Sequence, residues 1–215
     1  MMGSDNGIFD MNFTVDTERL ALRVAQPVLR HAETLARLVA SSDPLMSALR
    51  CVRTLGLRSW CIGAGAVRSL VWDALHGFEP GVPADVDVVH FDAVAAPEMD
   101  GELDRRLRAL MPGLNWEVTN QAHVHRWFEA SLGRTVAPLD SLDEGISTWP
   151  EFATCVGVSL ARDDSIHVIA PHGLDDLFEL RVRHNPSRAS ADDFNERVRS
   201  KRFRERWPRL TICSA

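Results

Sequence analysis

The sequence predicts an α+β fold in which a mixed β-sheet of about five strands is flanked by helices. Short apolar segments bounded by glycine and proline alternate with segments of helical periodicity between residues 57 and 119. Two further apolar segments, 154–160 and 165–169, are joined by a tight turn at Asp163 and Asp164, which predicts a β-hairpin. An antiparallel hairpin argues against a purely parallel, doubly wound sheet.

The composition is that of an ordinary globular protein, with 215 residues, 45% of them hydrophobic and 25% charged. A net charge of −6 argues against general coating of nucleic acid. The four cysteines are scattered without C-x-x-C spacing, so we expect reduced thiols. The first residues lack the features of a signal peptide, and no apolar run reaches the ~20 residues of a membrane span. We therefore expect a cytoplasmic protein with no membrane partner.

Two helices are predicted before the first strand. After a polar arm, a helix begins at Asp16, and Pro27 within its apolar stripe predicts a kink. Asp43 as N-cap and Pro44 at the first helical position predict a second helix, which Gly56 ends.

The centre of the chain is a strand, a glycine turn, a helix and a second strand. The first strand, 57–62, runs into Gly63-Ala64-Gly65, and the helix that follows stops at Gly77. The second strand opens with Asp85 and Asp87, which share one face of the strand because side chains alternate, with Cα atoms roughly 6.5–7 Å apart. Two carboxylates beside a glycine turn that opens a helix are suited to holding Mg²⁺ against a polyphosphate.

A third carboxylate lies on a later strand. A charged helix over 98–111, with Leu110 among its inward residues, precedes a strand over 114–119. In that strand Glu117 is flanked by the apolar Trp116 and Val118, and it is the best candidate for a third metal ligand. The remaining predicted elements are a helix over 122–132, a loop-rich segment over 138–150, a short helix within 170–178 and a basic amphipathic helix over 191–207.

Two common nucleotide-binding motifs do not fit. The dinucleotide fingerprint requires a third small residue where this chain has Arg68, and an acid at the end of the following strand rather than at its start. A Walker A loop requires Gly-Lys followed by Ser or Thr, and no such sequence follows the glycine turn.

The run Gly65-Ala-Val-Arg68 followed by Asp85-Val-Asp87 resembles the nucleotidyltransferases of the DNA polymerase beta superfamily. CCA-adding enzymes and poly(A) polymerases in that superfamily share an apolar strand, a Gly-Gly or Gly-Ser turn, an Asp-x-Asp pair and a third acid on a later strand. Two positions depart from the pattern. Ala64 replaces the first glycine of the pair, and Ser69 replaces the aspartate that usually follows the arginine.

A wider resemblance, over roughly residues 43 to 210, is to an uncharacterised bacterial family of nucleotidyltransferase-like proteins. It implies a polymerase-beta-like fold with a nucleotidyltransferase core over 44–183. The core would follow an N-terminal arm and helix over 1–43, and a basic C-terminal helix over 184–215 would pack on it. The segments that carry the resemblance are Ile62–Arg68, Val71–Gly77, Asp85–Asp92, Trp116–Ala122 with His125, and Ile169–Phe178.

The resemblance implies an enzyme that moves a nucleoside monophosphate from an NTP to an acceptor and releases pyrophosphate, with Mg²⁺ or Mn²⁺ as cofactor. The acceptor, whether an RNA end, a small molecule or a protein hydroxyl, is not specified, and neither is the NTP. The candidate residues form three groups: Asp85, Asp87 and Glu117 for catalysis and metal binding; Gly63, Gly65 and Arg68 for the nucleotide; and Asn120, Gln121 and His125 for an acceptor or base pocket.

Two other functions remain open. Ala64 and Ser69 leave room for a catalytically degenerate module of the same fold that binds nucleotide or a protein partner. A hydrolase that cleaves phosphate esters with the same metals is a third possibility. The basic C-terminal helix is either a solvated face, which we favour, or an acceptor-binding surface.

Several further residues have simple expected roles. Arg68 either reaches a phosphate or pairs with an acid of the sheet. Asp92 and His172 are expected to be local caps, and the two histidines of His123-x-His125 have no third zinc ligand nearby. Trp72 and Trp127 are expected in the core rather than as stacking platforms for bases.

Overall fold

The computed structural model describes residues 30–213, apart from the side chains of 131 and 132. Its main sheet has the strand order β3-β2-β1-β4-β5. β2 and β3 run parallel, whereas the other neighbouring pairs run antiparallel, which confirms the α+β class and the mixed five-stranded sheet. The strands are β1 (Trp60–Gly63), β2 (Val86–His90), β3 (Trp116–Asn120), β4 (Gly157–Leu160) and β5 (Ile166–Ile169).

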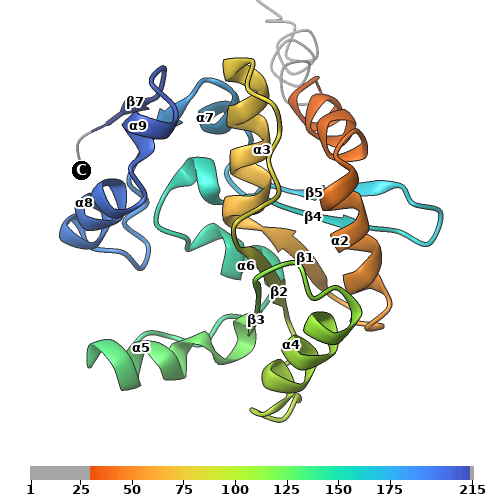
Figure 1. Cartoon of the computed structure of the whole chain (residues 1–215). Helices are drawn as coiled ribbons and strands as arrows, with labels where there is room; N and C mark the ends of the chain where they lie inside the picture. The colour runs from red at the N-terminus through yellow and green to blue at the C-terminus, as the bar shows by residue number, and fades with distance from the viewer. Residues whose placement is uncertain (1–29, 214–215) are drawn as a thin grey trace, which may run out of the picture.

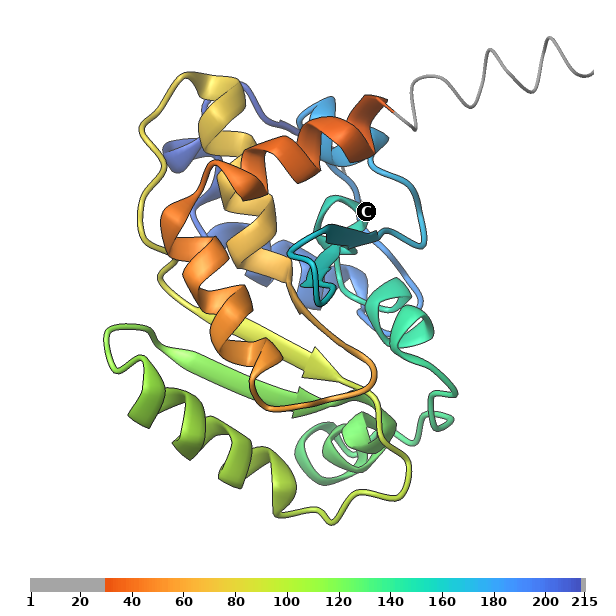
Figure 2. The ribbon, with the colours of Figure 1, turned by 90° about the vertical axis from the view of Figure 1, so that its right-hand side faces the viewer.

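Three helices pack on one face of this sheet (Figures 1 and 2). They are α2 (Asp43–Arg53), α3 (Ala64–His76) and α4 (Met99–Leu110), which lie against β4, against β1 and β2, and against β3 respectively. The apolar side chains that β2 and β3 direct to this face are buried in the main core, as strand alternation requires. These strand residues are Val86, Val88 and Trp116, and they join Leu49, Val67, Val71 and Leu107 of the helices.

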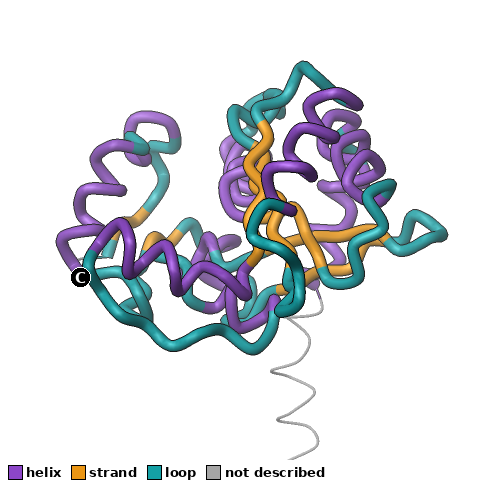
Figure 3. Tube along the Cα trace, turned by 90° about the horizontal axis from the view of Figure 1, so that it is seen from below, coloured by secondary structure: helices purple, strands orange, loops and turns teal. Residues whose placement is uncertain are grey.

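The opposite face of the sheet is covered only in part. A smaller apolar cluster forms there around Cys61 and Val89, closed by Leu142 and Ile146 of α6 (Leu142–Ser147). Seen from below, helices lie on both sides of the central strands (Figure 3). The part of this face that carries Asp87 and Glu117 borders a cleft.

The C-terminal segment folds back onto α3. It comprises α7 (Asp175–Phe178), β6 (Arg181–Val182), α8 (Ala191–Ser200), α9 (Phe203–Arg206) and β7 (Thr211–Ile212), with β6 and β7 paired in parallel. The rings of Phe203 and Trp207 meet the ring of Trp72 edge-on, with centroids 5.6 and 5.0 Å apart. The indole nitrogen of Trp207 also donates a hydrogen bond to Asp73, at 2.7 Å.

The predicted continuous helix over 191–207 is wrong, because the chain turns between α8 and α9. Arg202 adopts a left-handed conformation, with φ of 52°. A straight helix would place Phe203 and Trp207 on the line of α8, whereas the turn buries both side chains against α3, where they are 0% and 1% exposed. Burial of two large aromatic rings outweighs the cost of one left-handed residue, about 1–2 kcal/mol.

Four smaller predictions also need correction. Ser42, not Asp43, caps α2, since its hydroxyl accepts a hydrogen bond from the Leu45 amide. Leu110 is 59% exposed, and the segment expected to be loop-rich contains α6. Trp127 is 55% exposed, whereas Trp72 is fully buried as expected.

The predicted hairpin at Asp163 and Asp164 and the end of α3 at Gly77 are confirmed. Residues 30–40 are helical, but the predicted kink at Pro27 lies outside the described residues. The three-part division at residues 43 and 183 stays a prediction. Within residues 30–213, no helix is long and apolar enough to cross a membrane.

Candidate active site

The pairing of β2 with β3 places two carboxylates side by side. In the parallel register Asp87 lies opposite Glu117, and on its other side Asp87 is paired with Gly63 of β1. Asp85 immediately precedes β2. Glu117 is separated from Asp85 and Asp87 by α4 in the sequence, and the strand pairing places all three acids at one end of the sheet.

These acids border a cleft of about 680 Å³. Asp85, Asp87 and Glu117 line it, and so do cationic side chains of the C-terminal segment. The cations come from the segment before α8, from α8 itself, and from the chain through α9, and they are Arg188, Arg197, Lys201 and Arg206. The cleft thus offers negative and positive walls to the same ligand.

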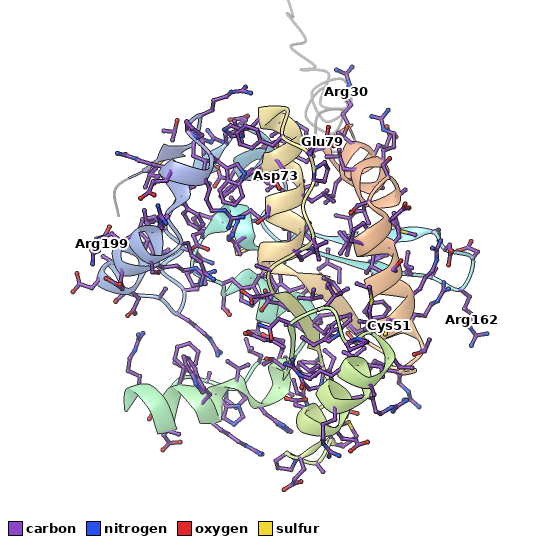
Figure 4. All side chains as sticks on the ribbon, in the orientation of Figure 1. Arg30, Cys51, Asp73, Glu79, Arg162 and Arg199 are labelled. Carbon is purple, nitrogen blue, oxygen red and sulfur yellow. The ribbon has the colours of Figure 1, made fainter. Side chains whose placement is uncertain are left out.

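The C-terminal basic residues divide between this cleft and the exterior. Arg197 and Lys201 line the cleft, and Arg197 is held by an ion pair with the buried Glu151 at 2.5 Å. Arg199 projects away from α8 (Figure 4) and pairs with Glu196 of the same helix at 2.7 Å. The expected solvated face therefore describes only part of this segment.

Burial and charge repulsion act together on Asp87. Partial burial raises the pKa of its carboxyl group, and the negative charges of Glu117 and Asp85 raise it further. The positive charges of Arg197 and Lys201, which also line the cleft, oppose the shift. Ionised Asp87 is therefore unfavourable in free energy, and a cation bound beside it would stabilise it.

The donor set suits a divalent cation, although the side chains are not yet gathered around one point. Asp85 Oδ1 accepts a hydrogen bond from Asn115 Nδ2 at 2.8 Å. Within residues 30–213, no three His, Cys, Asp or Glu side chains are grouped closely enough to hold a metal ion. Carboxylate oxygens are the ligands that Mg²⁺ prefers, and the repulsion at Asp87 favours a cation beside it.

The start of α3 faces the cleft without a side-chain cap. Gly63 is the N-cap residue, no side chain accepts from the first turn, and that turn contains no acid. The Ala64 amide is already bonded to the Val156 carbonyl at 3.1 Å, whereas Gly65 and Ala66 line the cleft. Uncapped amides at a helix N-terminus, together with the helix dipole, form an anion-binding site.

The two candidate glycines differ in role. A Cβ at Gly63 would lie 2.6 Å from Cη2 of Trp149 and 3.0 Å from the Val156 carbonyl oxygen, so close packing requires glycine there. Gly63 is buried and lies outside the cleft lining. At Gly65 the nearest atom to a Cβ would be Nη2 of Arg68 at 3.8 Å, so this glycine leaves space in the cleft.

Ala64 occupies a backbone conformation that favours glycine. Its φ is 50°, in the left-handed region, where the Cβ of an L-residue is crowded. In the Gly-Gly turn that this segment resembles, the same position is a glycine, which adopts this conformation without crowding. The consequence of alanine here is local strain.

Arg68 is buried at the edge of the cleft in an aromatic environment. Its side chain is 3% exposed, and its guanidinium lies over the rings of Trp72 and Phe203 at 5.0 and 4.8 Å. Nη1 donates to the Thr154 hydroxyl at 3.1 Å, and Nε has no partner among the described residues. Burial lowers the pKa of Arg68 to about 10. Arg68 was expected either to reach a phosphate or to pair with an acid of the sheet. Its hydrogen bond goes to Thr154, so it does not pair with a sheet acid.

Of the three residues expected in an acceptor or base pocket, only one lines the cleft. Gln121 lines the cleft. Asn120 is 1% exposed and holds a loop, because its side-chain amide donates to the Asp92 carbonyl at 2.7 Å and its oxygen accepts from the Asp92 amide at 3.1 Å. His125 lies outside the cleft lining.

Asp92 and His172 were both expected to be local caps, and their hydrogen bonds test this expectation. Asp92 caps its own loop by accepting from the Val94 amide at 3.0 Å, as expected. A hydrogen-bonding pair joins His172 Nε2 to the Ser147 carbonyl oxygen at 2.8 Å, which links α6 to the loop before α7. His172 therefore links a helix to a distant loop, and it is not a local cap.

The sequence prediction missed the aromatic wall of the cleft. Trp127 and Phe128 of α5 (Val124–Leu132) line it together with Val124. Their spacing of three and four residues marks one face of a helix. The same spacing is found on a face buried in a core, so the sequence carried no signal that this face would line a cleft.

The fold and the arrangement of acids beside a helix N-terminus define a polymerase-beta-like nucleotidyltransferase fold. The family model described as nucleotidyltransferase matches residues 50–212. The chain therefore belongs to this nucleotidyltransferase family. Among curated protein sequences, none matches the chain significantly.

Solved structures support the same fold. One, described as an NMR structure that reveals a CCA-adding enzyme head domain, is 26% identical with a TM-score of 0.70, covering 85% of this chain and 96% of that one. A CCA-adding enzyme with CTP is 18% identical, with a TM-score of 0.52 and coverage of 84% and 43%. The Thermotoga maritima CCA-adding enzyme with tRNA is 15% identical, with a TM-score of 0.52 and coverage of 83% and 42%. The chain thus spans less than half of these two enzymes.

Replacing Ala64 by glycine should stabilise the protein. Relief of the left-handed alanine is worth about 1 kcal/mol, which corresponds to a rise in Tm of about 2–4 °C. Thermal unfolding followed by circular dichroism measures the change. Ala74→Gly, in the interior of the same helix, is the control and should lower stability by about 0.5–1 kcal/mol. A lower Tm for Ala64→Gly than for the wild type would contradict the assigned backbone strain.

Replacing Asp87 by asparagine should stabilise the metal-free protein at pH 7, because it removes a charge that burial and two acids disfavour. The folded state binds the Asp87 proton more tightly than the unfolded state does, so this destabilisation grows as pH rises through the raised pKa. Chemical denaturation at pH 7 and pH 4 measures it, and the advantage of the variant should shrink at pH 4. Glu79→Gln, a loop residue (Figure 4), is the control. An equal advantage at both pH values would contradict the repulsion.

Proposed function

We propose that this protein is a metal-dependent nucleotidyltransferase that moves a nucleoside monophosphate from an NTP to an acceptor and releases pyrophosphate. The observation that carries the proposal is the pairing of Asp87 with Glu117 beside the uncapped start of α3, in one cleft. Family membership supports nucleotidyl transfer in general. Cysteines without disulfide spacing are in keeping with action in the cytoplasm.

Asp85, Asp87 and Glu117 are the residues that would hold Mg²⁺ or Mn²⁺. When bound, such an ion neutralises charge on the phosphate oxygens during in-line displacement. The repulsion that raises the pKa of Asp87 supports this assignment, because a cation turns the unfavourable cluster of charges into a binding site.

Different parts of the chain serve the triphosphate. The amides at the start of α3, near Gly65, would bind the terminal phosphates, and the lack of a side-chain cap there supports this role. Arg68 lies beside them as a fixed positive charge, and Arg197 and Lys201 of the C-terminal segment supply further positive charge to the cleft. Two solved relatives are described as complexes of CCA-adding enzyme with CTP and with ATP, which supports an NTP as the ligand.

The proposed transfer forms one bond at the α-phosphorus and breaks another, and a side chain of this protein takes the proton that is released. The acceptor hydroxyl oxygen forms a bond to the α-phosphorus, and the bond from that phosphorus to the oxygen bridging the α- and β-phosphates breaks. Glu117 would take the hydroxyl proton, and its exposure within the cleft lining supports this role. Pyrophosphate leaves toward the start of α3.

The second candidate is a catalytically degenerate module that binds nucleotide without transfer. The strained Ala64, at a position where the related turn carries glycine, favours it. The presence of all three carboxylates at the cleft favours the enzyme. A phosphate-ester hydrolase using the same acids would release product without labelling any acceptor.

The decisive experiment incubates the protein with each α-labelled NTP, Mg²⁺ and cell extract. We expect one class of molecule to become labelled, and we expect Asp85→Ala and Asp87→Ala to lower transfer by about 10³-fold or more while the fold persists. Glu117→Gln should lower it by about 10²–10⁴-fold, as for loss of a general base. Glu79→Gln should leave transfer unchanged.

The outcomes separate the candidates. Full transfer by Asp87→Ala would contradict the proposed site. Tight NTP binding with no labelled product and no NTP consumption indicates the degenerate module, whereas NTP consumption without a labelled acceptor indicates a hydrolase. Removal of divalent cations with EDTA should abolish transfer, and persistence of activity would exclude the metal-dependent mechanism.

A further inference from the structure

Trp127 is the most exposed of the six tryptophans of this chain. Trp127 of α5 is 55% exposed, whereas Trp60, Trp72, Trp116 and Trp207 are at most 8% exposed. Only Trp149, which is intermediate, shares some access to solvent. None of the α5 side chains whose burial is described is buried. In Figure 1, α5 extends from the end of β3 away from the helices that cover the sheet.

The apolar face of α5 is nevertheless part of the active-site cleft. Val124, Trp127 and Phe128 all line it. The rings of Trp127 and Phe128 meet edge-on, with centroids 5.1 Å apart and an interplanar angle of 84°. The guanidinium groups of Arg188 and Arg134 lie 5.6 and 6.0 Å from the Phe128 ring. The α5 wall therefore combines flat aromatic surface with positive charge.

The strand order decides which substrate meets this wall. The strands run β1, β2, β3 across the sheet; α3 follows β1, and α5 follows β3 after a short 3₁₀ turn. Gly63, at the start of α3, is paired with Asp87, whereas α5 follows the other end of β3, so the two helices approach the acids from different sides of β2 and β3 in the strand order. In-line displacement requires the attacking oxygen and the leaving pyrophosphate on opposite sides of the α-phosphorus. If pyrophosphate leaves toward α3, the acceptor lies on the side of Glu117 and α5.

We propose that α5 is the acceptor-binding wall and that the acceptor stacks a nucleobase on Trp127 while its ribose hydroxyl reaches Glu117. This inference rests on the proposed function. A nucleobase is the ring that fits best, because stacking on an exposed aromatic side chain is worth about 1–3 kcal/mol and the adjacent arginines complement a phosphate. Gln121, which also lines the cleft, offers both a donor and an acceptor to a base edge. A free nucleotide and the end of an oligonucleotide share this chemistry.

The test measures acceptor binding separately from NTP binding. Wild type, Trp127→Ala, Trp127→Phe and the control Leu110→Ala, an exposed apolar residue of α4 at 59% exposure, are first saturated with Mg²⁺ and α,β-methylene-ATP. AMP and the trinucleotide ApApA are then titrated by calorimetry. Trp127→Ala should weaken their binding by about 5–100-fold, and Trp127→Phe should retain most of it. Leu110→Ala should have no effect, and the affinity for the ATP analogue should be the same in all four proteins.

Each result has a defined meaning. Selective weakening in Trp127→Ala supports the acceptor wall. Within that result, tighter and salt-sensitive binding of ApApA points to an oligonucleotide end, and equal binding of AMP points to a free nucleotide. Equal affinities in wild type and Trp127→Ala overturn the inference, as does failure of wild type to bind either probe.

Three further results would also overturn it. Equal weakening of the ATP analogue in Trp127→Ala would show that Trp127 stacks on the base of the NTP. Loss of a wild-type dimer in Trp127→Ala, seen by sedimentation, would show that the tryptophan covers a second copy of the chain. If wild type does not bind the ATP analogue at all, the proposed function itself fails.

Discussion

The parallel pairing of β2 with β3 is the constraint on which the candidate site depends. It sets Asp87 beside Glu117, and the resulting repulsion, together with burial, raises the pKa of Asp87. The register that brings the acids together also places Val86, Val88 and Trp116 on the opposite face, where α2, α3 and α4 bury them. A shift by one residue would expose this apolar set to solvent, so the core holds the carboxylates in place against their mutual repulsion.

The C-terminal segment completes the cleft because it is anchored at two points. Phe203 and Trp207 pack around Trp72 of α3, and Arg197 pairs with the fully buried Glu151. Removing Arg197 would leave the charge of the buried Glu151 without its ion-pair partner, which is unfavourable. The cationic wall is therefore built into the same core as the sheet. One chain supplies both the acids and the opposing cations.

The charges of the cleft describe the kind of ligand that it suits. A simple anion would meet the acids, and a simple cation would meet Arg197 and Lys201. A polyphosphate that carries a divalent cation satisfies both walls at once, with its cation toward the acids and its phosphate oxygens toward the arginines. Arg68 adds a positive charge whose position is fixed by Thr154 and two aromatic rings, so little side-chain entropy remains to be lost on binding.

The sequence determined the local features of this protein: the glycine turn into α3, the Asp85-x-Asp87 alternation, the acid within β3, the hairpin and the α+β class. Each follows from short-range rules of turn chemistry and side-chain alternation. Tertiary structure alone decided that Asp87 is paired with Glu117, that Asn120 serves a loop, that the C-terminal helix breaks at Arg202, and that Trp127 faces a cleft instead of a core. These depend on which surfaces meet. An apolar residue at helical spacing is the same in sequence whether or not another element arrives to cover it.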